Sequence, residues 1–322
     1  MPKYRSALPQ LSDKLFLTDS GLETTLIFHD GMELPHFASI ALMRNPKGRA
    51  RLRQYFRRHL AIARDSGTGF IFESPTWRAS RDWAEKLGLK PAELAALNRR
   101  SIELMAEVRR EFAGAVSPMV LSGCLGPRGD GYKPGATMSA DEAENYHAGQ
   151  IAAFRDTEAD MIGAFTMNYV EEALGIARAA SAAGMPAAIS FTLETDGRLP
   201  TGQTLKEAIE AVDSATNSSP AYYMINCAHP THFEAIFAAG EKWADRIRGV
   251  RANASMRSHA ELDQAPDLDD GDPNALGSQY RALLQRLPQL TILGGCCGTD
   301  HRHIEAISHA CILHPHHAAH AA

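Results

Sequence analysis

Three cysteines are spaced in a way that suits metal coordination. Cys227 follows an asparagine in INCAHP, and Cys296 and Cys297 are adjacent in GGCCGT. Thiolates are soft ligands that favour zinc over magnesium or calcium, and zinc with three protein ligands keeps a fourth position open for water or substrate. The flanking glycines allow the sharp backbone path that two adjacent ligands need. We therefore predict a catalytic Zn²⁺ site formed by Cys227, Cys296 and Cys297.

The cysteine count also bears on redox state. Five cysteines, an odd number with two of them adjacent, make a poor disulfide framework and indicate reduced thiols or a metal site. We interpret Cys124 and Cys311 as small buried hydrophobic residues. A vicinal disulfide or redox switch at Cys296 and Cys297 is the alternative to the metal site.

The elements that must position these cysteines follow from periodicity. Apolar runs rich in β-formers alternate with helical patterns along the whole chain. The runs occupy residues 15–18, 70–73, 118–122, 160–165, 187–193, 222–226, 247–253 and 291–295, with helical patterns at 92–112, 140–157, 171–183, 204–216 and 274–287. Eight such units favour an α/β fold, a (β/α)8 TIM barrel, over the competing doubly wound open sheet. The sixth and eighth runs end at the cysteines, and barrel enzymes place their sites at these strand ends.

No Ser-rich or Gly-rich linker divides the chain, which predicts one barrel domain over residues 1–312 and a flexible His/Ala-rich tail over 313–322. The acidic stretch 263–273 is expected to be an exposed insertion. The net charge is −5, and Lys and Arg form no basic stripe along the sequence. We therefore expect the protein to bind small molecules and to bind neither nucleic acid nor a membrane. No secretory signal or run of roughly 18 apolar residues is found, which predicts a cytoplasmic protein. A homo-oligomer remains possible.

The cysteine motifs carry a resemblance to a known family. INCAHP together with GGCCGTDHRHI resembles the zinc signature of the homocysteine S-methyltransferases, and the likeness extends over nearly the whole chain. LTDSGLETTL, ESPTWRAS, SGCLGPRGDGY, ISFTLETDGRLPTGQTL and VRANAS are similar to other strand ends of that family. The resemblance implies methyl transfer from a sulfonium or betaine-type donor to a small, homocysteine-like thiol acceptor. A free thiol has a pKa of about 8.5, whereas a thiol that coordinates zinc is deprotonated, so zinc would activate the acceptor as a thiolate.

Substrate-binding residues are expected at the other strand ends. The resemblance implies that Asp19, with Ser20 and Gly21, binds the acceptor; a turn or helix-cap Asp is the alternative for Asp19. Thr166 is expected beside the substrate, although a Thr at a strand end is commonplace. Asn226 is expected at the barrel mouth, where it would bind substrate or fix its neighbours.

Three weaker candidates are also expected near the site. Asn253 is expected to hold loops at the barrel mouth in the same way. Trp77 is a candidate wall for a cationic donor, with a packing role as the alternative. Glu23 is either a site residue or a surface residue.

One position departs from the family pattern. The family usually has Glu-Thr where this chain has Phe165-Thr166, and that glutamate would bind the amino group of homocysteine. We hypothesise that the natural acceptor is either not homocysteine, for example a thiol without the α-amino group, or is held differently. Glu73 or Glu194 could then supply the missing carboxylate.

Two other functions remain open from the residues alone. One is a zinc-dependent lyase or hydrolase, which three charged thiolates disfavour because they make bound water less acidic than neutral histidines do. The other is a non-catalytic zinc-binding or thiol-sensing protein. No additional module for cobalamin or folate is recognised, which favours sulfonium or betaine-type donors.

Overall fold

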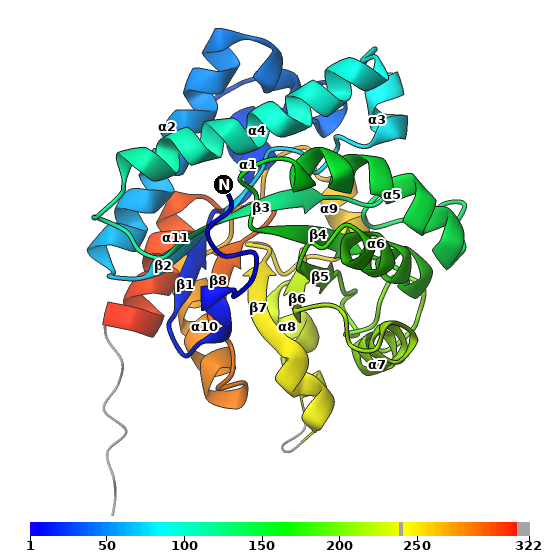
Figure 1. Cartoon of the computed structure of the whole chain (residues 1–322). Coiled ribbons are helices and arrows are strands. Elements are labelled where there is room, and N and C mark those ends of the chain that lie inside the picture. The colour runs from blue at the N-terminus through cyan, green and yellow to red at the C-terminus, as the bar shows by residue number, and fades with distance from the viewer. Residues whose placement is uncertain (238–240, 314–322) are drawn as a thin grey trace, which may run out of the picture.

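The computed structural model describes residues 1–237 and 241–313. Within these residues, eight parallel strands form a closed barrel in which each strand pairs with the next and β8 pairs with β1 (Figure 1). The strands are β1 (Phe16–Thr18), β2 (Gly69–Glu73), β3 (Met119–Leu125), β4 (Met161–Met167), β5 (Ala187–Phe191), β6 (Tyr222–Asn226), β7 (Ile247–Ala252) and β8 (Ile292–Gly295). All eight predicted runs are strands, and the predicted (β/α)8 barrel is confirmed.

Helices surround the barrel on its outside (Figure 1). Among the described residues they are α1 (Leu22–Thr24), α2 (Pro46–Asp65), α3 (Arg81–Lys86), α4 (Pro91–Glu111), α5 (Ala140–Arg155), α6 (Val170–Ala182), α7 (Leu205–Thr216), α8 (Pro230–Phe233), α9 (His259–Gln264), α10 (Pro273–Arg286) and α11 (His301–Ser308). The five predicted helical segments correspond to α4, α5, α6, α7 and α10. Capping boxes, in which a Ser or Thr and a Glu three residues later satisfy the first free N–H groups, begin α5, α7 and α9.

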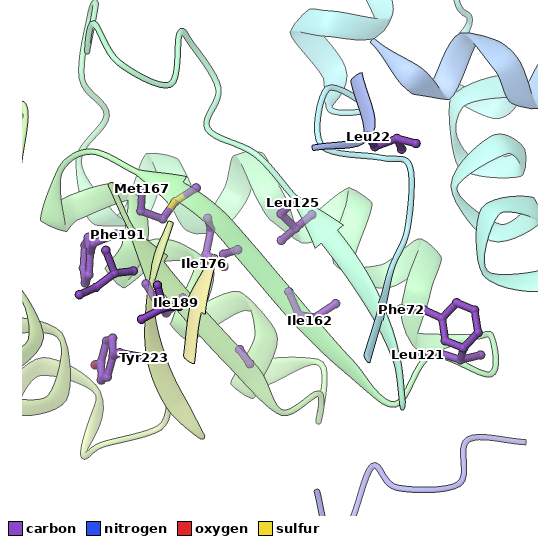
Figure 2. Packing of buried hydrophobic residues seen from close by; sticks show 14 of the residues in the cluster. Leu22, Phe72, Leu121, Leu125, Ile162, Met167, Ile176, Ile189, Phe191 and Tyr223 are labelled. Atoms are coloured by element: carbon purple, nitrogen blue, oxygen red, sulfur yellow. The ribbon is translucent and has the colours of Figure 1, made fainter. Parts of the chain in front are cut away.

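The hydrophobic core lies mainly between the strands and the helices. Figure 2 shows side chains of this layer, with Met167, Ile189, Phe191 and Tyr223 gathered on adjacent strands, and all four are buried. A second cluster fills the barrel interior, so the barrel is a packed core and not a pore. The N-terminal segment adds hydrogen bonds from the backbone of Lys3 and Tyr4 to Asp160, which directly precedes β4. A site with access to solvent is therefore expected at the opposite end, where the strands finish.

The remaining expectations concern loops and the chain end. Residues 263–273 begin in the last turn of α9 and continue as a mostly exposed loop, tied to the barrel by a 2.7 Å hydrogen bond from Ser255 to Asp269. The predicted tail lies, from residue 314 onward, outside the described residues, and the boundary at 312 stays a prediction. In the described part of the chain, no helix is long and apolar enough to cross a membrane.

Candidate metal centre and acceptor pocket

The three predicted cysteines come together at the C-terminal ends of β6 and β8. The sulfur atoms of Cys227, Cys296 and Cys297 all lie within 4.8 Å of one another. The structure joins Cys227 and Cys296 by a disulfide, with their Cα atoms 5.4 Å apart, and leaves Cys297 as a free thiol. The vicinal disulfide considered as an alternative is therefore not the pairing that the structure shows.

The backbone at the cysteines is turned sharply and held by hydrogen bonds. Cys227 has a φ of 53°, a left-handed conformation that is uncommon for a residue with a side chain. Its carbonyl oxygen accepts hydrogen bonds from the Asn253 amide at 3.1 Å and from the His259 ring at 2.5 Å. After the cysteine pair, Gly298 has a φ of 78°, where a Cβ would come within 2.8 Å of a carbonyl oxygen. The contacts of Cys227 fix its segment against the residues after β7, and the left-handed turn at Gly298 is consistent with the sharp backbone path that we expected beside the adjacent cysteines.

Asn226, at the end of β6, braces both β5 and β4. Its side-chain oxygen accepts hydrogen bonds from the backbone N–H of Thr166 at 2.8 Å and from the Ser190 hydroxyl at 2.7 Å. Its amide nitrogen donates to the Thr166 hydroxyl at 2.9 Å. Thr166 has a φ of 63°, a strained conformation for a β-branched residue, so these bonds hold it in place. The same amide nitrogen lies 3.8 Å from the Cys296 sulfur, so Asn226 fixes Thr166 and also contacts one of the cysteines directly.

Two aromatic residues cover the cysteines, and the sequence analysis did not find them. The Tyr132 hydroxyl lies 3.3 Å from the Cys297 sulfur, and its ring stacks on His259 with centroids 3.9 Å apart. His259 also contacts the Glu194 carboxylate at 3.0 Å. Burial raises the pKa of the Cys297 thiol, and the hydrogen bond with Tyr132 opposes this. Both rings come from the segments after β3 and β7; Tyr132 ends the motif SGCLGPRGDGY, which was the signal that could have revealed it, whereas His259 lies in no motif that we recognised.

A cavity of about 310 Å³ opens beside the sulfur atoms. All nine predicted site residues line it: Asp19, Ser20, Gly21, Phe165, Thr166, Asn226, Cys227, Cys296 and Cys297. Glu23, Glu73 and Trp77 line it as well, whereas Glu194 and Asn253 are not part of its wall. The structure thus brings the predicted residues to one place, and their roles toward substrates remain proposals.

The floor of the cavity contains a buried ion pair. An Arg251 Nη lies 2.7 Å from the Asp19 carboxylate, and both side chains are less than one-tenth exposed. Arg251 also donates to the Gly295 carbonyl oxygen at 3.1 Å, and its guanidinium lies 5.2 Å from the centre of the Phe165 ring. Burial raises the pKa of Asp19, and the charge of Arg251 opposes that shift. Sequence analysis missed Arg251, although a charged residue inside an apolar strand run was a signal that could have revealed it.

The outer wall of the cavity carries a second cation. The Arg78 guanidinium lies 4.1 Å from the ring of Trp83 and 5.0 Å from that of Trp77. The Trp77 indole N–H points to the Phe165 carbonyl oxygen at 3.4 Å. One face of Trp77 therefore already contacts a cation of the protein itself.

Comparison with known proteins agrees with this geometry. The family model for homocysteine S-methyltransferase matches residues 16–311. The chain belongs to the homocysteine S-methyltransferase family. It is an S-methyltransferase, as the cysteine motifs led us to expect.

Curated members of the homocysteine S-methyltransferase family match this chain over most of its length at low sequence identity. Homocysteine S-methyltransferase 1 of Arabidopsis thaliana is 23% identical over 91% of this chain and 92% of its own length. Homocysteine S-methyltransferase 4 of Zea mays is also 23% identical, over 74% of this chain and 75% of its own length. Among solved structures, the oxidised and metallated forms of the Escherichia coli homocysteine methyltransferase MmuM have TM-scores of 0.73 and 0.71. Both are 20% identical and cover 92% of this chain and 96% of theirs. These two likenesses show a shared fold.

Proposed function

We propose that this protein transfers a methyl group from a sulfonium or betaine-type donor to a small, homocysteine-like thiol, with Zn²⁺ held by Cys227, Cys296 and Cys297. The observation that carries the proposal is the convergence of three sulfur atoms within 4.8 Å at the edge of a cavity of about 310 Å³. Family membership favours this reaction over the lyase, hydrolase and sensor alternatives.

The cysteine trio fits the proposed metal. Sulfur atoms bound to one tetrahedral zinc at about 2.3 Å are about 3.8 Å apart, which is compatible with the spread of the trio. Only thiolates coordinate zinc, so the bond between Cys227 and Cys296 has to be reduced first. MmuM, which shares this fold, has been solved in a metallated form, and this supports a metal here. The need for reduced thiols supports a cytoplasmic location.

When bound, zinc would supply its open position to the acceptor sulfur, which binds there as a thiolate at neutral pH. The protein's own residues would hold the acceptor in place. Thr166, fixed by Asn226, lies 3.9 Å from the Cys227 sulfur and would form the wall nearest the reacting atoms. Tyr132 would donate a hydrogen bond to Cys297 and cover it from solvent.

The loop after β1 would form the part of the wall next to Cys296. The Ser20 hydroxyl contacts the His59 ring at 2.9 Å and the Tyr55 hydroxyl at 3.1 Å, so it is held rigidly. Gly21 packs so closely on the Cys296 carbonyl that a Cβ would come within 2.5 Å of it. We assign Asp19, Ser20 and Gly21 to the acceptor pocket on this basis. A positively charged donor is already activated, so its alignment with the acceptor sulfur would account for much of the remaining rate enhancement.

The test is a direct assay of the product. Reduced, zinc-loaded protein is incubated with L-homocysteine and either S-methylmethionine or betaine, and the products are analysed by mass spectrometry. The proposal expects methionine from at least one donor, and loss of that product in Cys297→Ser. If no thioether forms with either donor, or if Cys297→Ser is fully active, the proposed function is wrong.

A further inference from the structure

Arg251 places a cation on the floor of the cavity, and the protein satisfies its hydrogen-bond donors only in part. The residue is 8% exposed and stands on β7, between the two strands that end at the cysteines. Its Nε donates to the Gly295 carbonyl oxygen at 3.1 Å, and its Nη2 lies 2.7 Å from the Asp19 carboxylate and 3.3 Å from the Ser20 carbonyl oxygen. Within the described part of the chain, the other terminal nitrogen, Nη1, has no hydrogen-bond partner, and it is not one of the unpartnered polar atoms that are sealed from solvent. Nη1 therefore faces the open space of the cavity that Arg251 lines.

The guanidinium group of Arg251 takes the position beside the cavity wall that a substrate cation would need. Its central carbon lies 5.2 Å from the centre of the Phe165 ring, so this ring already has a cation over it. The same group neutralises Asp19 in the buried ion pair. Burial lowers the pKa of Arg251, but the charge of Asp19 and other groups raises it above its usual value, so the guanidinium stays charged.

Glu73 adds no negative charge to this floor at neutral pH. Burial raises the pKa of Glu73 to about 8, and Arg251 opposes that shift, so the carboxyl group is mostly protonated at pH 7. Glu194, the other acid that we considered from the sequence, contacts His259 at 3.0 Å and does not line the cavity. Neither residue therefore offers a free carboxylate to a substrate ammonium group.

The acidic residues of the outer wall are also engaged. Asp130 lies 3.7 Å from Arg78, and Asp263 lies 2.9 Å from Lys133. Glu23 accepts a hydrogen bond from a serine hydroxyl at 2.7 Å, and burial raises the pKa of its carboxyl group. Among the described residues that line the cavity, no ionised carboxylate is thus left without a partner, whereas one guanidinium nitrogen is.

A carboxylate is the ligand that fits this floor, because a guanidinium group binds carboxylates through charge-assisted hydrogen bonds. Building on the proposed function, we propose that Arg251 Nη1 binds a carboxylate of the acceptor, so that the preferred acceptor is a short mercapto acid without an ammonium group. The acceptor sulfur then lies at the cysteines, and its carboxylate lies beside Arg251. Homocysteine has the same carboxylate and remains an acceptor, but it binds more weakly because its ammonium group meets a guanidinium and no free carboxylate.

Calorimetry tests this assignment without any methyl donor. Reduced, zinc-loaded protein is titrated with 4-mercaptobutyrate, with L-homocysteine, which adds an ammonium group, and with 4-mercapto-1-butanol, which has a hydroxyl in place of the carboxylate. We expect 4-mercaptobutyrate to bind about 10- to 150-fold more tightly than the alcohol, the ratio that corresponds to a charge-assisted hydrogen bond. It should also bind more tightly than homocysteine.

Two matched variants separate the cations of the cavity. Arg251→Lys keeps a positive charge near Asp19 but removes Nη1, so it should lose most of the preference for 4-mercaptobutyrate over the alcohol. Arg78→Lys changes the cation of the outer wall and should keep that preference.

Three results would overturn the proposal: equal affinities for 4-mercaptobutyrate and the alcohol, homocysteine binding at least as tightly as 4-mercaptobutyrate, or an undiminished preference in Arg251→Lys. If Arg251→Lys does not fold, the order of the three affinities in the unmodified protein decides. Failure of the proposed function is distinguishable, because no thioether would then form from homocysteine or from 4-mercaptobutyrate, whereas the affinities still report on Arg251.

Discussion

Replacing Arg251 by methionine should destabilise the protein strongly. The side chain is 9% exposed and lies 2.7 Å from Asp19, which is 3% exposed. Removing one partner of a buried ion pair leaves an uncompensated charge, which costs about 3–5 kcal/mol. The same change removes the hydrogen bond from Arg251 to the Gly295 carbonyl oxygen, next to the cysteine pair. We therefore expect both lower stability and weaker metal binding.

Urea unfolding at pH 7 measures the effect. With a denaturant slope of about 3 kcal/mol per molar urea, a loss of 3–5 kcal/mol moves the midpoint down by about 1–1.7 M. The matched control is the double variant Asp19→Asn with Arg251→Met, which removes both charges. The double variant should lose less free energy of unfolding than Asp19→Asn and Arg251→Met lose together, because it leaves neither partner as an unpaired ion. A midpoint shift below about 0.3 M for Arg251→Met, or strictly additive losses, would refute the reasoning.

Three further predictions follow from single contacts. Tyr132→Phe removes the hydroxyl that contacts Cys297, and zinc affinity measured by competition with a chelator should fall about 10- to 100-fold; an unchanged affinity would contradict this role. Burial lowers the pKa of His59 to about 4 in the folded protein. As the pH drops, the unfolded chain therefore binds a proton at this histidine at a higher pH than the folded protein does, and the free energy of unfolding should fall by up to about 3 kcal/mol between pH 6.5 and pH 4. His59→Gln should flatten that pH dependence in unfolding experiments, and an equally steep profile would argue against it. Gly298→Ala forces a Cβ into a left-handed turn and should cost about 1–2 kcal/mol in urea unfolding, whereas Gly149→Ala, within a helix and with open space around it, should cost nothing.

The fold could be predicted because the barrel repeats one simple pattern. Each run is buried on both sides of a parallel strand, so its sequence is mainly apolar and is easily separated from the helical pattern that follows. The convergence of Cys227 with Cys296 and Cys297 followed from the same rule, since strand ends of one barrel share a mouth. Local sequence was sufficient for these features.

The charged floor of the cavity could not be predicted in the same way. Arg251 lies within an apolar run, and its partner Asp19 is near the other end of the chain, so only the closed barrel brings them together. The sequence left Glu73 and Glu194 as equal candidates for a missing carboxylate. The structure distinguishes them because Glu73 lines the cavity and Glu194 contacts a histidine outside its wall. Side-chain direction at the strand ends, and not residue type, decides such roles.

The central claim is that three cysteines form one zinc site, and elemental analysis of the reduced, dialysed protein tests it most directly. We predict about one zinc per chain in the unmodified protein and in the control Cys311→Ala, which changes a cysteine outside the cavity. Cys227→Ala, Cys296→Ala and Cys297→Ala should each lose most of the metal. Full zinc retention in all three of these variants would contradict the account.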